Sequence, residues 1–254
     1  MMKNLRIISR LDIKDQYLIK SINFEGLRKV GLAKDYALKY YKENIDEIFY
    51  IDAVSSLFNK SFVTNFLEMA CEKIRIPVTV GGGIKNVAQA KKILRFGADK
   101  IAINTAGVKN PDLLRKMSES IGSQSVVSYI EAKKNPKKNI WEVYINNGKE
   151  NTEIDVMKWA DIVQKQGVGE LLVTSVDYEG TENGFDINLY SELSKNVTVP
   201  LIANGGCGKI DDIEELLNCA NLDGVVMSSI FHFNKLKINE IKKHFKNKDY
   251  EIRY

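Results

Sequence analysis

Cysteine, histidine and proline are scarce in this chain of 254 residues, which contains 3, 2 and 4 of them. The cysteines form no Cys-x-x-Cys pair, and His232 and His244 are too few to complete a Cys/His zinc cage. The same scarcity excludes a disulfide framework. The composition therefore predicts a protein without a metal site, and no motif indicates a cofactor.

The chain also lacks a long apolar segment and a strong excess of one charge. No apolar run approaches the ~18 residues of a membrane-spanning helix, and no charged-then-apolar leader is present. The chain has 37 basic and 33 acidic residues, which gives a net charge of +4. This balance is too even for the electrostatic footprint of a nucleic-acid-binding protein. We therefore expect a soluble, cytoplasmic protein that binds neither nucleic acid nor a membrane.

Short β-branched segments alternate with longer amphipathic ones along the chain, which is typical of repeated βα units. Helical patterns such as 32–41, 87–96 and 210–220 follow the strands. A spacing of roughly 32 residues per unit predicts a closed (β/α)8 barrel. The alternative, a doubly wound open sheet, lacks its GxGxxG fingerprint here. The eight predicted strands are 5–13, 46–52, 76–81, 99–104, 125–132, 169–175, 199–204 and 223–228.

The sequence repeats itself at half its length. Residues 76–85 match 199–209, and about one unit later 98–105 match 222–229. Strands three and four therefore correspond to strands seven and eight. No linker separates the halves, so we predict one domain made of two similar half-barrels, residues 1–122 and 123–254.

Two segments fall outside the regular βα pattern. Residues 139–151 carry Asn146-Asn147-Gly148 between alternating apolar residues, which predicts a β-hairpin inserted after strand five. Residues 15–31 form a long connection after strand one, and we interpret them as a mobile active-site loop.

Glycine-rich turns follow strands three and seven, and small polar residues end strands four and eight. Such turns let backbone N–H groups approach an anion, so each half offers one phosphate cradle. Either turn alone is also explained as an ordinary turn. The pair favours a substrate with a phosphate at each end, or a barrel with one working site and one relic. The candidate phosphate-binding residues are Gly82, Gly83, Asn104, Thr105, Gly205, Gly206, Ser228 and Ser229.

Two carboxylates end opposite strands of the predicted barrel. Asp12 closes strand one and Glu131 closes strand five, across the mouth where acid–base chemistry takes place. The alternative is that each caps a loop or pairs with Lys14 or Lys133. His232, between two phenylalanines, is interpreted as a core residue. Further polar groups at this level are Asp52, Asp177 and Glu179.

Four charged residues stand at strand beginnings, at the opposite end of the barrel. By spacing alone they are explained as solvated surface charges, which contribute ~0–1 kcal/mol per pair. They are Arg6, Glu47, Lys100 and Glu170.

Short motifs follow one another in order along the chain. They are RLDIKD at 10–15 with Lys20 and NFE at 23–25, TVGGGI at 79–84, GADK at 97–100, INT at 103–105, GSQ at 122–124, GE at 169–170, TS at 174–175, GT at 180–181, GG at 205–206, GK at 208–209 and FHF at 231–233. Along essentially its whole length the sequence resembles the HisF family, the cyclase subunits of imidazole glycerol phosphate synthase.

The resemblance implies a barrel that receives ammonia from a HisH-type glutaminase docked at its N-terminal face. The barrel then cleaves and cyclises a bisphosphorylated ribonucleotide at its C-terminal face. By the same resemblance, Asp12, Lys20 and Glu131 are catalytic, and Asp99 lies at the glutaminase interface. The charged quartet at the strand beginnings corresponds to the family's ammonia gate. Asp177, Gly180 and Thr181 join the phosphate-binding set.

The departures from the family pattern are larger side chains. Glu131 and Glu179 replace aspartates, and strand alternation places Arg10 and Tyr129 inside the barrel. A buried Arg10 needs a partner, which Glu131 or the substrate could provide. These differences favour membership of the paralogues that use ammonia to amidate a nucleotide-activated surface sugar.

Three functions therefore compete. The first is an ammonia-using synthase subunit, of the histidine pathway or of its sugar-modifying paralogue. The second is a silent barrel that activates a glutaminase, and the third is an isomerase on a related half-barrel repeat. Asp12, Lys20 and the two phosphate cradles favour the enzyme, because a scaffold needs only the bottom face.

Overall fold

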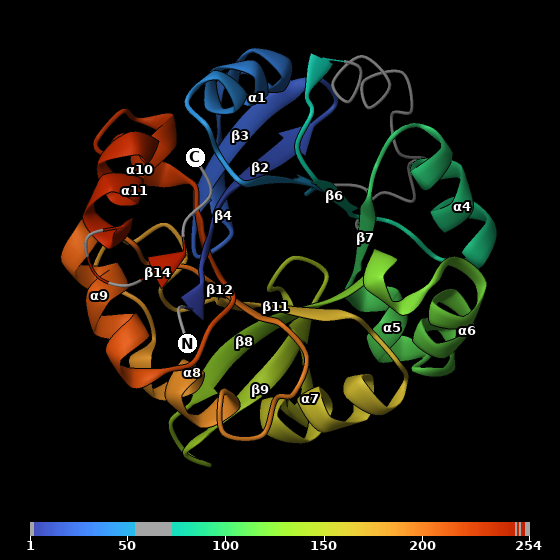
Figure 1. Ribbon diagram of the computed structural model, residues 1–254. Coiled ribbons are helices and arrows are strands. Elements are labelled where there is room, and N and C mark those ends of the chain that lie inside the picture. Colours follow the sequence, from blue (N-terminus) through green and yellow to red (C-terminus); the bar gives the residue numbers. More distant parts are fainter. Residues whose placement is uncertain (1–2, 54–72, 247, 249, 252–254) are drawn as a thin grey trace.

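Eight parallel strands close into a barrel in this computed structural model, which describes residues 3–53, 73–246, 248 and 250–251. The closing pair is β13 with β2, whose register begins with Gly224 opposite Arg6. Figure 1 shows the strands around the centre and the helices outside them. The predicted barrel is confirmed. Its strands are β2 (Arg6–Lys14), β5 (Glu47–Asp52), β6 (Val78–Gly81), β7 (Lys100–Ile103), β8 (Val126–Asn135), β11 (Glu170–Ser175), β12 (Leu201–Asn204) and β13 (Gly224–Met227).

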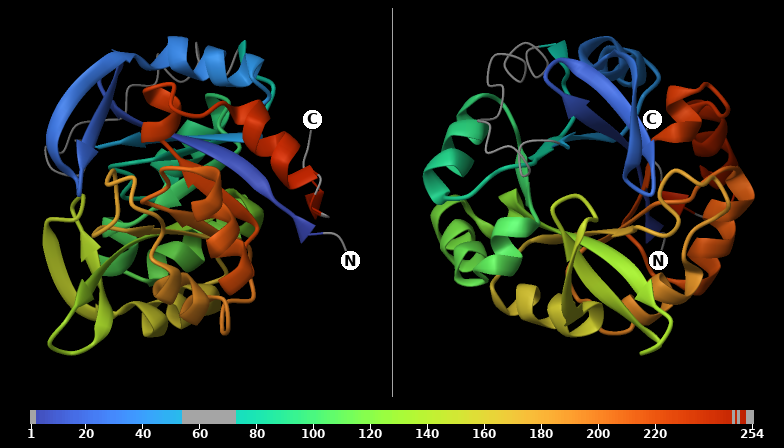
Figure 2. Two further views of the ribbon diagram at one scale, coloured as in Figure 1. Left: turned by 90° about the vertical axis from the view of Figure 1, so that its left-hand side faces the viewer. Right: turned by 180° about the vertical axis from the view of Figure 1, so that it is seen from behind.

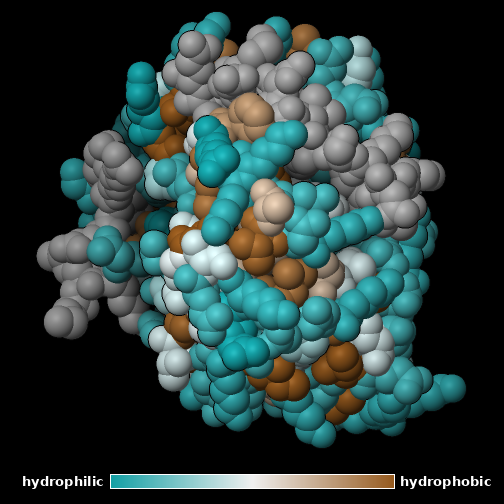
Figure 3. All heavy atoms as spheres, turned by 90° about the vertical axis from the view of Figure 1, so that its right-hand side faces the viewer, coloured by the Kyte–Doolittle hydropathy of each residue, from teal (hydrophilic) through white to brown (hydrophobic). Residues whose placement is uncertain are grey.

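Amphipathic helices cover the outside of the barrel, and Figure 3 shows mostly hydrophilic side chains on one side of it. In the described part of the chain, no helix is long and apolar enough to cross a membrane. The helices are α1 (Ala33–Lys42), α4 (Val87–Arg95), α5 (Thr105–Lys109), α6 (Asp112–Ile121), α7 (Val156–Lys165), α8 (Ile187–Leu193), α9 (Ile210–Cys219), α10 (Ser229–His232) and α11 (Ile238–Lys246), with a 3-10 turn at Ser123–Ser125. The short strands β1 (Lys3–Asn4) and β14 (Tyr250–Glu251) pair near the chain ends.

Both faces of the barrel strands are buried. Outward side chains pack beneath the helices in one large apolar cluster, and inward side chains form a second cluster along the barrel axis. Strand β2 illustrates the division, because Ile7 and Leu11 belong to the outer cluster and Ile8 to the inner one. The inner cluster consists of Ile8, Phe49, Ile51, Ala102, Val127, Tyr129, Leu172, Ile202 and Val226.

The prediction of a loop at 15–31 is wrong, because this segment is a β-hairpin. Strands β3 (Tyr17–Ile22) and β4 (Glu25–Leu32) pair with each other, and β3 extends β2 antiparallel. Asn23 and Phe24 turn the chain with φ of 49° and 63°, the positive values that tight hairpin turns need. Five of the eight β4 residues are charged or glycine and none is buried, which hides its strand character in the sequence.

The predicted hairpin at 139–151 is confirmed, and β9 (Ile140–Ile145) and β10 (Glu150–Asp155) pair antiparallel beside β8. Figure 2 shows both hairpins at the same end of the barrel. They meet where Gly148 packs against the Phe24 ring. The two insertions therefore cover the C-terminal mouth from opposite halves of the chain.

The Tyr190 hydroxyl ties α8 to two barrel strands. It lies 2.6 Å from the Asn204 carbonyl oxygen and 3.0 Å from that of Val173, and it accepts the Asn204 N–H at 3.1 Å. Because these backbone groups are buried, Tyr190→Phe should lower the free energy of unfolding by about 1–3 kcal/mol in urea titrations. Tyr41→Phe is the control, since that hydroxyl makes no hydrogen bond with the described residues. Equal, small effects of both changes would contradict the prediction.

Candidate active site

The two glycine-rich turns have similar backbone conformations. Gly82 and Gly83 have φ of 101° and 66°, and Gly205 and Gly206 have 102° and 107°. A Cβ at Gly82 would lie 2.4 Å from the Asp52 carbonyl oxygen, so only glycine fits there. This correspondence supports the interpretation of two similar half-barrels.

The first cradle opens into a cavity of about 390 Å³. Gly82 and Gly83 line it with Asn104 and Thr105, and Glu131 faces the same space. The Asn104 Oδ1 is buried without a hydrogen-bond partner among the described residues. The cavity therefore combines a glycine-rich backbone turn, an amide with spare hydrogen-bonding capacity and a carboxyl group.

The second cradle is nearly closed, with a cavity of about 10 Å³. Lys20 from β3 reaches over it and forms a buried ion pair with Glu179. Burial alone would raise the pKa of Glu179, but the charges of Lys20 and Arg10 and its hydrogen bonds lower it overall. The two cradles of the repeat therefore differ in free volume. The second is lined by Gly180, Gly205, Gly206, Ser228 and Ser229 among others.

Arg10 lies inside the barrel, as strand alternation predicts, with no exposed surface. Its partner is Asp12, which corrects the expectation of Glu131 or the substrate. The Arg10 Nε and Nη2 atoms lie 2.8 and 2.7 Å from the Asp12 Oδ1. Asp12 is two residues along the same strand and face, so its short side chain reaches back to the guanidinium.

Glu131, across the mouth, forms no ion pair with any residue that the structure describes. Its Oε2 accepts the N–H of Gly148 at 2.8 Å, from the turn between β9 and β10. Burial raises the pKa of Glu131 to about 7, against the opposing effects of the Gly148 amide and the Arg10 charge. Glu131 can therefore hold or release a proton near neutral pH.

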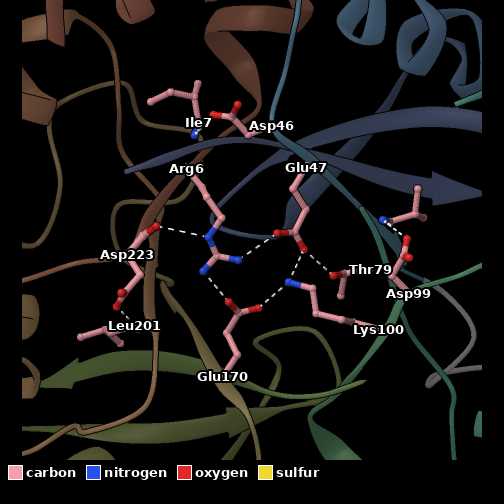
Figure 4. A network of polar contacts seen from close by, with 11 residues as sticks. Arg6, Ile7, Asp46, Glu47, Thr79, Asp99, Lys100, Glu170, Leu201 and Asp223 are labelled. Carbon is pink, nitrogen blue, oxygen red and sulfur yellow. Dashed lines mark hydrogen bonds and ion pairs between the residues drawn. The ribbon is translucent and has the colours of Figure 1, made fainter. Parts of the chain in front are cut away.

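At the other end of the barrel the charged quartet forms a closed ring (Figure 4). Arg6 contacts Glu47 and Glu170, and Lys100 lies 2.7 Å from Glu47 and 2.8 Å from Glu170. Thr79 also donates to Glu47. Glu47 is only 1% exposed, so the interpretation as solvated surface charges is wrong.

Asp99 has a structural contact beside this ring. Its Oδ2 accepts the N–H of Val78 at the start of β6, at 2.8 Å. In the same way, the Asp223 Oδ2 accepts the N–H of Leu201 at the start of β12, at 2.9 Å (Figure 4). These two aspartates occupy equivalent positions in the repeat. Asp99 is also exposed, so its predicted place at an interface stays a prediction.

Two predicted phosphate-binding residues lie outside both cavities. Asp177 accepts the N–H of Lys134 near the turn between β8 and β9, and the Thr181 hydroxyl donates to the carbonyl of Tyr178. Sequence reasoning missed Asn204, whose amide donates to Thr174 and Glu179 beneath the second cradle. The sequence contained a signal for this residue. Asn204 ends strand seven at the position where the matching strand three ends in Gly81.

His232 is buried and accepts or donates a hydrogen bond with the Tyr40 hydroxyl at 2.7 Å, so its interpretation as a core residue is confirmed. Burial lowers the pKa of His232 to about 3, which keeps the ring neutral.

The fold and this mouth define a (β/α)8-barrel enzyme, with its candidate acid–base groups at the C-terminal ends of the strands. The chain belongs to the histidine biosynthesis protein family, whose profile matches residues 6–237. It is 41% identical over 248 residues to the imidazole glycerol phosphate synthase subunit HisF of Clostridium botulinum strain Okra, covering 98% of each chain. The subunit of that name from Legionella pneumophila is 47% identical over 211 residues, which are 83% of this chain and 99% of the relative. That of Bacillus cereus ATCC 10987 is 40% identical, again over 98% of each chain.

These matches do not favour the surface-sugar alternative, because the relatives carry the name of the imidazole glycerol phosphate synthase subunit. The enlarged residues Arg10, Tyr129 and Glu131 thus occur in a chain that is otherwise similar to those subunits over nearly its full length.

The raised pKa of Glu131 predicts how stability changes with pH. The folded protein keeps the Glu131 proton up to about pH 7, whereas the unfolded chain loses it near the ordinary 4.5. The contribution is therefore complete below pH 4.5 and is lost as the pH rises through 7, by on the order of 3 kcal/mol. Urea titrations from pH 4.5 to 8 should show a steeper fall for the natural protein than for Glu131→Gln. Glu119→Gln, an exposed change on α6, should keep the natural slope.

Proposed function

We propose that this chain is the ammonia-dependent cyclase subunit of an imidazole glycerol phosphate synthase. It would use ammonia from a partner glutaminase to convert a bisphosphorylated ribonucleotide into imidazole glycerol phosphate and an aminoimidazole carboxamide ribonucleotide. The observation that carries the proposal is the mouth itself, where Glu131 lines the cavity beside the Gly82–Gly83 cradle and Asp12 lies on β2, the strand opposite β8 in the barrel. The names of the similar subunits supply the synthase and its product, imidazole glycerol phosphate. The ammonia, the bisphosphorylated substrate and the second product are what the family resemblance implies.

The two cradles would hold the two phosphates of the substrate. One phosphate fits the open cavity, where the Gly82 and Gly83 turn meets Thr105 at the start of α5. The other fits the Gly205–Gly206 turn once Lys20 leaves Glu179, because the pair now fills that space. The Lys20 ammonium then becomes available to the bound phosphate.

Proton transfer would fall to the carboxylates between the cradles. Glu131 lines the open cavity and can carry a proton near neutral pH, as a general acid or base requires. Asp12 supplies a fixed negative charge at the opposite side, where it stabilises positive charge on the reacting ammonia or substrate nitrogen.

The charged ring would form the passage from a glutaminase docked beneath the barrel. Its two cations and two anions balance, and each carboxylate bridges both cations. Such a ring can admit a small neutral molecule only by shifting a side chain, which gives a docked partner a way to control it.

Asp12→Asn tests the reaction. Purified natural protein with ammonium salt should turn over the bisphosphate, and Asp12→Asn should lose about 10²–10⁴-fold in kcat while remaining folded, because a positioned charge is removed. Asp161→Asn, an exposed change on α7, is the control. Retained turnover in Asp12→Asn would assign its role to Glu131. A natural protein that only stimulates a glutaminase, without turnover on ammonium, would indicate the scaffold function instead.

Lys100→Ala tests the partner. Removal of Lys100 leaves Glu47 and Glu170 with one cation between them, which disturbs the buried ring. We expect less product per glutamine hydrolysed and unchanged product from ammonium salt. The measurement compares both nitrogen sources with and without the glutaminase, and Lys116→Ala on α6 is the surface control. Equal losses on both sources would indicate a folding defect, and no loss on either would contradict the role of the ring.

A further inference from the structure

Arg10 is the largest fully buried side chain of the described residues, and it is held on every side by the barrel interior. Its Nη1 donates to the Tyr129 hydroxyl at 2.9 Å and lies 3.4 Å from the Thr174 hydroxyl. The rings of Phe24 and Tyr129 lie 5.4 and 5.3 Å from its Cζ. The guanidinium is therefore enclosed between β2, β8, β11 and the tip of the β3–β4 hairpin.

A buried cation is tolerated only beside an anion that compensates for its lost hydration. For Arg10 that anion is Asp12, because two guanidinium nitrogens converge on one carboxylate oxygen. Burial alone would lower the pKa of Arg10, but the Asp12 charge raises it overall, so the guanidinium stays charged. The Asp12 carboxylate therefore serves as the counter-ion of Arg10 inside the barrel.

Glu131 also interacts with the Tyr129 side chain. Tyr129 accepts a hydrogen bond from Arg10, and its own contact with Glu131 favours the ionised carboxylate. Burial raises the pKa of Tyr129 well above its ordinary value, so its hydroxyl keeps its proton. The positive charge of Arg10 therefore acts on both carboxylates. It contacts Asp12 directly, and it reaches Glu131 through space and through the intervening Tyr129.

We propose that Arg10 is a positioning residue that fixes Asp12 as an ion-paired carboxylate and leaves Glu131 as the group that exchanges protons with the substrate. The division of roles rests on the proposed function, whereas the electrostatic coupling of the three side chains does not. The charged and titratable groups that act on Glu131 are Arg10 on β2 and Tyr129 on β8, and Tyr144 on β9 is its cross-strand neighbour. Asp52 on β5, Lys85 before α4 and Lys109 on α5 line the same cavity as Glu131.

The coupling is tested by titrating Glu131 directly. Carboxyl-¹³C glutamate labelling with NMR detection gives its midpoint, and Glu131→Gln assigns the signal. Arg10→Met removes the positive charge at similar volume, so the midpoint should rise by about one pH unit or more. Asp12→Asn leaves the Arg10 charge uncompensated, so the midpoint should fall. Arg10→Lys, which restores a cation, should return the midpoint toward that of the natural protein.

The matched control is Lys242→Met on α11, which removes another buried cation, paired with Asp46 at 2.6 Å. It loses a comparable ion pair far from the mouth, so its Glu131 midpoint should equal that of the natural protein. An unchanged midpoint in Arg10→Met and Asp12→Asn, or an equal shift in Lys242→Met, would overturn the inference. If Arg10→Met fails to fold, the fall expected in Asp12→Asn and the recovery in Arg10→Lys still decide it.

The division of roles has a kinetic signature. In Arg10→Met the pH at half-maximal kcat on ammonium should move upward with the Glu131 midpoint, while KM for the bisphosphate changes by less than about 3-fold. A pH profile that stays in place while the NMR midpoint moves would assign proton transfer to another group and overturn the role of Glu131. Absence of turnover in the natural protein would contradict the proposed function alone, because the NMR titration would still test the coupling.

Discussion

Closure of the sheet is the constraint on which the rest of this molecule depends. Once eight strands form a ring, every second side chain points to the axis, where space is limited and water is excluded. The inward residues of β2 show the result in order, with Arg6 at the bottom, Ile8 in an apolar layer, then Arg10 and Asp12 at the mouth. Charged side chains therefore lie at the two ends of the barrel axis, and apolar side chains lie between them.

Buried charge is balanced separately at the two ends of the barrel. At the bottom, Arg6 and Lys100 share Glu47 and Glu170, and at the mouth Arg10 pairs with Asp12 and Lys20 with Glu179. The apolar inner cluster lies between these groups, so neither end can neutralise the other. Glu131 differs from these groups, because among the described residues no ion pair holds it, its Oε2 accepts the Gly148 N–H, and burial raises its pKa to about 7.

The two halves of the repeat are used unequally. Their glycine turns share a conformation, but the first opens into a large cavity and the second is filled by a lysine delivered from the β3–β4 hairpin. The hairpin between β9 and β10 supplies the amide that contacts Glu131. A symmetric barrel thus carries an asymmetric mouth, because each half bears a different insertion.

The sequence by itself determined the barrel, because the alternation of β-branched and amphipathic segments and the internal repeat depend only on local pattern. It also placed Asp12, Glu131 and both glycine turns, since strand ends of parallel strands meet at one face. It could not show that residues 15–31 form a hairpin, because β4 is stabilised by pairing with β3 rather than by its own polar composition. Only the tertiary structure decided that Arg10 pairs with Asp12 and that Lys20 closes the second cradle, and it replaced the spacing-based interpretation of the four strand-start charges with the ring that the resemblance implies. Each of these contacts joins side chains whose distance is set by the closed sheet, and a linear pattern contains no such distance.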